Sequence, residues 1–135
     1  MAQNRFASAR RSHSRENAED YVELIDTLIR ERGEARAVDL AERLGISHVT
    51  VSRTIQRLKR EGLVQRQPYR AIFLTPKGSR MAQAARERHA LVREFLLAIG
   101  VSEAVAEIDA EGIEHHVSQE TLAAMRRLVD KGETG

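Results

Sequence analysis

The sequence contains no cysteine, no long apolar run and no secretory signal. The absence of cysteine excludes disulfide bonds and thiolate metal sites and fits a cytoplasmic protein. No run approaches the ~18 apolar residues that span a bilayer, and the amino terminus lacks the apolar segment of a signal peptide. We therefore expect no membrane partner. With 41% hydrophobic residues, the 135-residue chain can form one compact domain or a small two-part protein.

Motifs of common enzymes are also missing. The chain has no His-Glu-x-x-His zinc helix, no paired Glu-x-x-His motifs of di-iron bundles and no glycine-rich phosphate loop. A Glu/His acid–base pair would have no nucleophile or substrate pocket beside it. We therefore expect no catalytic residues and no small-molecule substrate. A small helical metal-dependent enzyme or a metal-storage protein stays open as an alternative from a different class.

Charge is spread unevenly, although the net charge is only +2. Residues 1–15 carry four arginines and no acid, and residues 47–70 carry six basic residues and one acid. Residues 101–135 carry eight acids and three bases. A basic first half suits a polyanion and an acidic second half suits cations. Because residues 1–15 are polar and aperiodic, we expect them to be a disordered basic tail.

Three helices and a hairpin are expected over residues 16–76. Apolar residues recur at helical spacing in residues 18–33, and a short helix ends at Gly45. A third helix begins after Ser47, which is a good N-cap. Residues 63–66 and 71–74 are strand candidates on either side of the turn "QPYR". This order predicts a winged helix-turn-helix DNA-binding domain in a mainly α fold with a small β-hairpin.

The polar face of the third helix has the side chains that read base edges. Arginine can bind guanine, glutamine can bind adenine, and valine or threonine can contact a thymine methyl group. A solvated surface is the alternative for one such helix alone, but the neighbouring turn and basic hairpin favour double-stranded DNA. The DNA-binding candidates are Ser47, His48, Val49, Thr50, Ser52, Arg53, Gln56 and Arg57, with Arg66, Tyr69 and Arg70 in the wing.

Residues 77–135 are expected to form an all-helical second domain. A long helix from Thr75 carries a broad apolar stripe near its carboxy-terminal end, and such a stripe needs either the remaining helices or a second subunit to cover it. Ser118 is a convincing N-cap for the last helix.

Carboxylates and histidines gather in the stretch "DAEGIEHHVS", residues 109–118. On one helix, Glu111, Glu114 and His115 would share a face, whereas His116 would point away. His115 is therefore the better candidate for a metal ligand.

Three further candidates lie earlier in the chain. Asp20 and Glu23 are three residues apart on the first helix, and His89 sits among apolar residues. Each has an ordinary alternative: an acid at a helix start, a surface acid and a core histidine, respectively.

Four features together resemble the manganese-responsive repressors (MntR type) of the diphtheria toxin repressor family. They are "EDYVELIDTLIRERGEAR", the helix-turn-helix with its wing, "ERHALVREFL" and "DAEGIEHHVS", and the resemblance covers about residues 18–130. It implies a winged helix-turn-helix domain followed by a helical metal-binding and dimerisation domain. It also implies a homodimer that binds palindromic operators of manganese-uptake genes when loaded with Mn²⁺. The ligands that it implies are Asp20, Glu23, His89, Glu111, Glu114 and His115.

The donor chemistry of this set agrees with the resemblance. Four carboxylates and two imidazoles suit Mn²⁺ or Fe²⁺ better than a thiolate-preferring metal. We expect two Mn²⁺ ions per subunit, whose +4 charge would cancel four carboxylates. Iron-responsive relatives are similar in the rest of the site but have Met at the position of Asp20. An iron-responsive repressor with Fe²⁺ therefore stays open as the alternative within the family.

Overall fold

The computed structural model describes residues 2–66 and 70–134, with side chains from Ser14 to Arg66 and from Arg70 to Gly132. Six α-helices, one turn of 3-10 helix and a two-stranded hairpin lie within these residues, so the mainly helical fold with a β-hairpin is confirmed. The chain divides into two compact units. Residues 13–83 form the amino-terminal unit, and most of the carboxy-terminal unit comes from residue 84 onward. This division falls inside α4 (Pro76–Ala98), beyond the boundary expected at residue 76.

The first helix is longer than the sequence analysis predicted. Helix α1 (Ala2–Arg32) includes residues 2–15, so the expectation of a disordered tail is wrong for that segment. No proline or glycine occurs before Gly33. Extending a helix that already exists costs less than starting a new one, because only the first turn bears the nucleation penalty. The polar composition that suggested disorder therefore does not end the helix.

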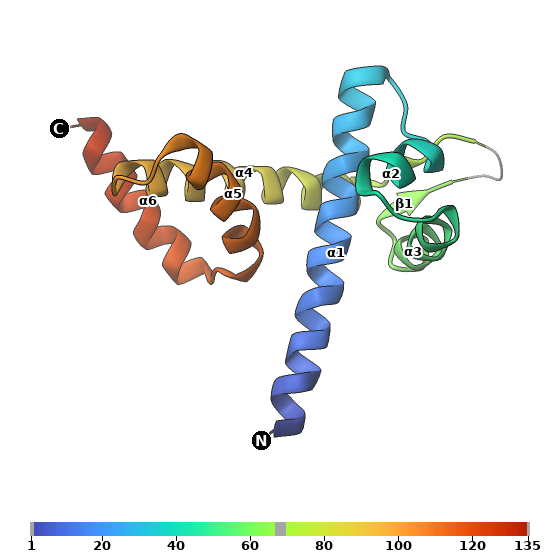
Figure 1. The fold of residues 1–135 in the computed structure, drawn as a ribbon, viewed down its shortest axis with the longest axis horizontal. Coiled ribbons are helices and arrows are strands. Elements are labelled where there is room, and N and C mark those ends of the chain that lie inside the picture. Colours follow the sequence, from blue (N-terminus) through green and yellow to red (C-terminus); the bar gives the residue numbers. More distant parts are fainter. Residues whose placement is uncertain (1, 67–69, 135) are drawn as a thin grey trace. The chain divides into compact units, whose positions relative to one another are not determined.

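The helix-turn-helix is built by two local signals. Helix α2 (Ala37–Leu44) ends at Gly45, whose φ of 65° lies in the left-handed region that favours glycine. Helix α3 (His48–Arg60) begins at Ser47, whose hydroxyl accepts a hydrogen bond from the Thr50 amide at 3.1 Å. Figure 1 shows α2 and α3 next to each other beside α1. The apolar faces of these helices form one core, with fully buried Ile25, Leu28, Leu40, Val51, Ile55 and Leu58.

The wing follows α3 as a short antiparallel hairpin. Strands β1 (Val64–Gln65) and β2 (Phe73–Leu74) pair in the register Val64↔Leu74, and both are shorter than the segments predicted. The Ile72 amide donates to the Ala35 carbonyl at 2.8 Å, which ties the hairpin to the connection between α1 and α2. Residues 67–69, with the predicted contact residue Tyr69, lie outside the described part of the chain.

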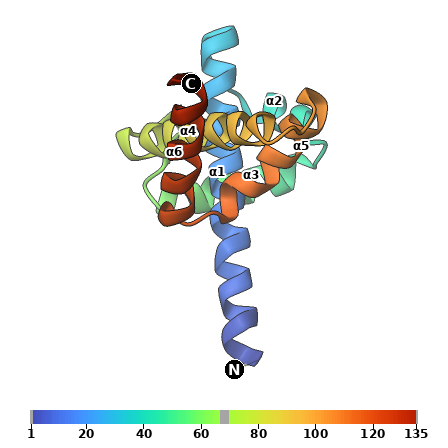
Figure 2. The same ribbon diagram turned by 90° about the vertical axis from the view of Figure 1, so that its left-hand side faces the viewer.

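The carboxy-terminal unit is helical. Helix α5 (Glu103–Ile113), the 3-10 turn η1 (Glu114–His116) and helix α6 (Gln119–Thr134) pack beside α4 (Figure 2). Ser118 caps α6, because its hydroxyl accepts from the Thr121 amide at 3.1 Å. The buried residues of this core are Leu91, Val92, Leu96, Ala106, Ala110, Leu122 and Val129. None of the described helices combines the length and apolar character that a bilayer span requires.

We predict that Gly78→Ala destabilises the amino-terminal unit. Gly78 is buried in the first turns of α4, and a Cβ atom there would collide with the backbone carbonyl of Leu63. Overpacking typically costs about 1–3 kcal/mol, whereas the gain in helix propensity is about 1 kcal/mol. Circular dichroism should therefore report a lower melting temperature.

Gly132→Ala is the matched control for this change. Gly132 is exposed in α6, and no atom lies within 4 Å of the added Cβ position, so stability should be kept or slightly raised. A Gly78→Ala protein that melts at or above the parent temperature would contradict the predicted collision.

Candidate metal centre and nucleic-acid interface

A histidine and two glutamates converge in the carboxy-terminal unit. His89 lies on α4, Glu111 on α5 and Glu114 in η1, and one ligand atom from each lies within 4.8 Å of the others. His89 Nδ1 is 3.4 Å from Glu111 Oε1 and 3.4 Å from Glu114 Oε2. One imidazole nitrogen thus faces two carboxylates from two different elements.

The apolar core of the carboxy-terminal unit positions these side chains. Ala106 and Ala110 of α5 are fully buried in the core cluster that α5 shares with α4. Helix α5 ends at Ile113, so the expected continuous helix through His115 is wrong. Glu111, near the end of α5, and Glu114, in the 3-10 turn, still face the same imidazole. Arg88 Nε also donates to the Glu114 carbonyl at 3.2 Å and holds η1 against α4.

The two neighbouring histidines have different surroundings. His115 is buried, and its Nε2 atom lies 3.3 Å from Glu114 Oε1. His116 is exposed and borders a shallow pocket lined by Ile108 and Ile113. His115 is thus buried beside Glu114, whereas His116 is exposed; His115 as the better candidate for a metal ligand stays a prediction.

The second nitrogen of His89 has a partner that the sequence analysis missed. His89 Nε2 lies 2.8 Å from Glu107 Oε1, and Arg93 Nε lies 2.9 Å from Glu107 Oε2. The hydrogen bond to His89 holds the pKa of Glu107 below its ordinary value, and the charge of Arg93 acts in the same direction. Glu107 precedes Glu111 by one helical turn, so the same spacing that singled out Glu111 could have suggested it.

The residues at this cluster fit a hard divalent cation. Among the residues that the structure describes, none forms a hydrogen bond with the buried His89 Nδ1. Buried polar atoms are rarely left in this state, and such an atom calls for an explanation such as an ion. An imidazole nitrogen between two carboxylates is a donor set suited to Mn²⁺ or Fe²⁺.

The two ligand candidates of the amino-terminal unit lie on α1. Asp20 and Glu23 are half-buried and three residues apart, so they share one face of the helix. Tyr21, Val22 and Ile25 belong to the buried face of the same turns. The carboxylates of Asp20 and Glu23 are thus carried by a helix whose other face belongs to the core of the amino-terminal unit.

Helix α3 presents most of the predicted DNA-binding residues to solvent. Val49 is 60% exposed, although it is apolar. Arg57 differs from the rest, because its guanidinium donates to Asn17 Oδ1 at 2.8 Å and is held against α1. The exposed members of the set are Ser47, His48, Val49, Thr50, Ser52, Arg53 and Gln56.

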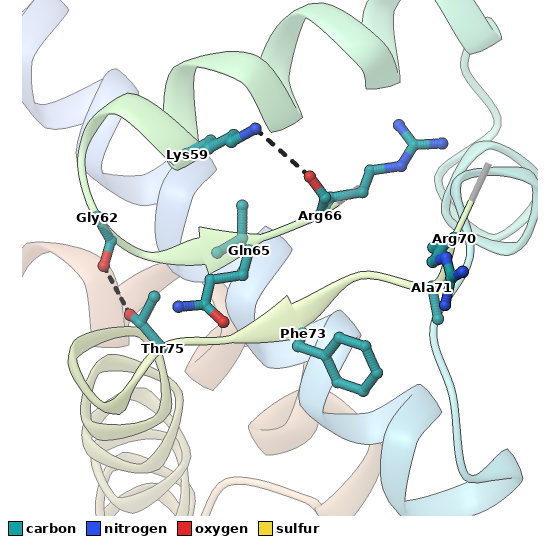
Figure 3. A pocket seen from close by; sticks show the side chains of 9 residues that line it. Lys59, Gly62, Gln65, Arg66, Arg70, Ala71, Phe73 and Thr75 are labelled. Atoms are coloured by element: carbon teal, nitrogen blue, oxygen red, sulfur yellow. Dashed lines mark hydrogen bonds between the residues drawn. The ribbon is translucent and has the colours of Figure 1, made fainter. Parts of the chain in front are cut away.

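The wing forms an open basic pocket of about 690 Å³ beside α3. Figure 3 shows Lys59 reaching the Arg66 carbonyl, with an Nζ–O distance of 3.4 Å, while the guanidinium of Arg66 extends away from it. Arg70 is exposed and Arg66 is half-buried. Together with Lys59, these side chains place positive charge along the hairpin, as a phosphate-binding wing requires.

Models of two domains of known proteins match the two parts of the chain. The model of the iron dependent repressor N-terminal DNA binding domain matches residues 13–72. The model of the iron dependent repressor metal binding and dimerisation domain matches residues 75–134.

Individual relatives are similar over most of the chain. The transcriptional regulator MntR of Escherichia coli is 53% identical over 126 residues, which are 93% of this chain and 81% of that protein. MntR of Salmonella typhimurium is 56% identical over 119 residues, which are 88% of this chain and 76% of that protein.

A solved manganese-dependent transcriptional repressor in complex with manganese has a similar fold. Its TM-score is 0.73 at 34% identity over 84% of this chain, and the match covers 52% of that protein. The chain thus spans about half the length of this solved repressor. From its sequence relatives and its two matching domains, the chain belongs to the diphtheria toxin (iron-dependent) repressor family of metal-dependent DNA-binding transcriptional regulators, whose members are not enzymes.

Proposed function

We propose that the chain is a manganese-dependent repressor that binds Mn²⁺ and then a palindromic operator of manganese-uptake genes. The observation that carries this proposal is the buried His89 Nδ1, which has no hydrogen bond among the described residues and faces two carboxylates at 3.4 Å. The similar solved repressor is manganese-dependent and was obtained in complex with manganese, which supports the choice of metal. The proposed ligands are Asp20, Glu23, His89, Glu111, Glu114 and His115.

The donor set favours Mn²⁺ and two ions per subunit. Mn²⁺ is the weakest binder in the divalent series, so a protein selects it by ligand type and geometry rather than by affinity. Four hard carboxylates and two imidazoles, in a chain without cysteine, match that need. A carboxylate at Asp20 rather than a thioether favours Mn²⁺ over Fe²⁺.

Helix α1 can couple the metal centre to DNA. Asp20 and Glu23 lie within two turns of Asn17, which accepts the hydrogen bond from Arg57 of α3 at 2.8 Å. A shift of α1 therefore carries the DNA-reading helix with it as part of one packed core. When bound, the ions supply positive charge that offsets the repulsion between carboxylates. Two carboxylates 4 Å apart repel each other by about 1 kcal/mol in water and by about 4 kcal/mol near a protein surface.

We propose that metal binding raises the fraction of the protein that is in the arrangement able to bind the operator. Without ions, the carboxylates within each set of proposed ligands repel one another. With ions, the arrangement in which both sets of ligands are shared is favoured, and we propose that this arrangement fits the operator.

The working form is proposed to be a cytoplasmic homodimer on double-stranded DNA. Helix α5 leaves apolar side chains exposed, with Val105 at 46% and Ile108 at 71%. A second copy of the chain would cover such a surface. Two reading helices related by a two-fold axis would then match the two halves of a palindrome.

Fluorescence anisotropy tests this function directly. Labelled DNA from upstream of a manganese-transporter gene is titrated with protein in Mn²⁺, Fe²⁺, Zn²⁺ or chelator. Mn²⁺ should strengthen specific binding, and chelator should abolish the gain. Operator binding that is equally tight in chelator would overturn the proposal.

Replacing a proposed metal ligand should reduce the effect of Mn²⁺ on DNA binding. Glu111→Gln replaces an anionic oxygen ligand with a neutral amide, and His115→Gln removes the imidazole nitrogen. Loss of even an outer partner of a metal ligand typically costs 10–100-fold. The Mn²⁺-induced gain in operator affinity should therefore fall about tenfold or more, with little change in the melting temperature of the metal-free protein. The exposed His116→Ala is the control and should keep the gain; an equal loss in this control would contradict the assignment.

Arg53 and Arg70 should differ in how they bind DNA. Arg53→Ala should cost about 1–3 kcal/mol on the operator and little on scrambled DNA, as expected of a base contact. Arg70→Ala should weaken both DNAs and make the salt slope shallower by about one unit, as expected of a phosphate contact. Fluorescence anisotropy with operator DNA and with scrambled DNA, at several salt concentrations, measures these affinities and their salt dependence. The assignments are wrong if the two variants behave alike.

Asp20 should set the choice of metal. Asp20→Met replaces a hard anionic oxygen with a soft thioether, which Fe²⁺ tolerates better than Mn²⁺ does. Activation of operator binding by Mn²⁺ should fall, while activation by Fe²⁺, measured without oxygen, should be kept or improved. If the variant responds to both metals as the parent does, Asp20 does not set the choice of metal, and the groups around His89 must do so.

A further inference from the structure

Glu107 is placed to control the ring of His89. The ring lies between two kinds of carboxylate: Nδ1 faces Glu111 and Glu114 at 3.4 Å each, whereas Nε2 is 2.8 Å from Glu107. A neutral imidazole has one N–H donor and one acceptor nitrogen. Because a carboxylate only accepts, the 2.8 Å contact places the proton on Nε2 and leaves a lone pair on Nδ1.

Arg93 holds Glu107 in this position. Its Nε atom is 2.9 Å from Glu107 Oε2, so the two oxygens of Glu107 bind two different partners on α4. Arg93 follows His89 by one helical turn, and Glu107 reaches across from α5 to both. The rotation of the Glu107 carboxylate is therefore fixed from two directions.

We infer that Glu107, braced by Arg93, is a positioning residue that locks His89 in the Nε2–H tautomer and so presents Nδ1 to the metal ion. Ligand histidines commonly donate their other N–H to a carboxylate, which sets the tautomer and the ring orientation. This inference rests on the proposed metal site and adds to it a residue outside the six proposed ligands.

The exposure of Glu107 indicates that it acts by orienting the His89 ring rather than by its own charge. The Glu107 side chain is 55% exposed, whereas that of His89 is 17% exposed. Water screens the charge of an exposed carboxylate, so Glu107 attracts a nearby cation weakly. Its effect on the ion must then come through the hydrogen bond, which an amide oxygen can replace. Glu107→Gln should therefore behave much like the parent, and Glu107→Ala should not.

The first test observes the tautomer in the metal-free protein. Two-dimensional ¹⁵N–¹H NMR of the histidine side chains distinguishes the two neutral tautomers, and it is recorded at about pH 8, where an ordinary imidazole is neutral. His89 should be in the Nε2–H form in the parent and in Glu107→Gln, and a mixture of tautomers in Glu107→Ala. A parent His89 in the Nδ1–H form would overturn the inference.

The second test measures Mn²⁺ affinity by calorimetry on the full chain. Glu107→Ala should bind Mn²⁺ about tenfold more weakly or worse, whereas Glu107→Gln should stay within about threefold of the parent. Glu103→Ala is the matched control, because it removes an exposed acid one turn earlier on α5. Its affinity should match that of the parent.

The outcomes distinguish the inference from the function on which it rests. Failure of the parent chain to bind Mn²⁺ would defeat the proposed function. Parent-like affinity in Glu107→Ala would overturn the inference alone. Equal losses in Glu107→Gln and Glu107→Ala would also overturn it, because Glu107 would then act by its charge or as a direct ligand.

Discussion

Negative charge gathered around one imidazole is the constraint on which the metal-binding unit depends. Glu111 and Glu114 face one nitrogen of His89 at 3.4 Å, and Glu107 binds the other at 2.8 Å. The Glu114 side chain is fully buried, and burying a carboxylate is costly unless an opposite charge or several donors offset it. A divalent cation would offset this charge more completely than the neighbouring histidines can, which is the physical basis for proposing a metal site at this cluster.

Helix α1 is the element that connects the proposed metal ligands to the DNA-binding helices. Helix α1 carries two proposed ligands on one face and core residues such as Ile25 on another. The same helix holds the reading helix α3 through the contact between Asn17 and Arg57. A change that fixes α1 therefore fixes the reading helix without any rearrangement inside the amino-terminal unit.

Elements with strong local signals could be predicted from the sequence, and elements that depend on packing could not. Gly45 and Ser47 mark the turn before the reading helix by backbone freedom and capping, and both act as expected. The helical start of α1 was missed because polar composition does not reveal propagation from a docked helix. Glu107 was missed because an exposed acid on an isolated helix is ordinary, and only the packing of α5 on α4 brings it to His89.

Thermodynamic reciprocity tests the central claim of coupling most directly. If metal and operator favour the same arrangement, each must strengthen the binding of the other by the same factor. Mn²⁺ affinity is measured by calorimetry with and without saturating operator DNA, and operator affinity with and without Mn²⁺. We predict that both factors exceed about fivefold and are equal within error. A Mn²⁺ affinity that operator DNA leaves unchanged would contradict it.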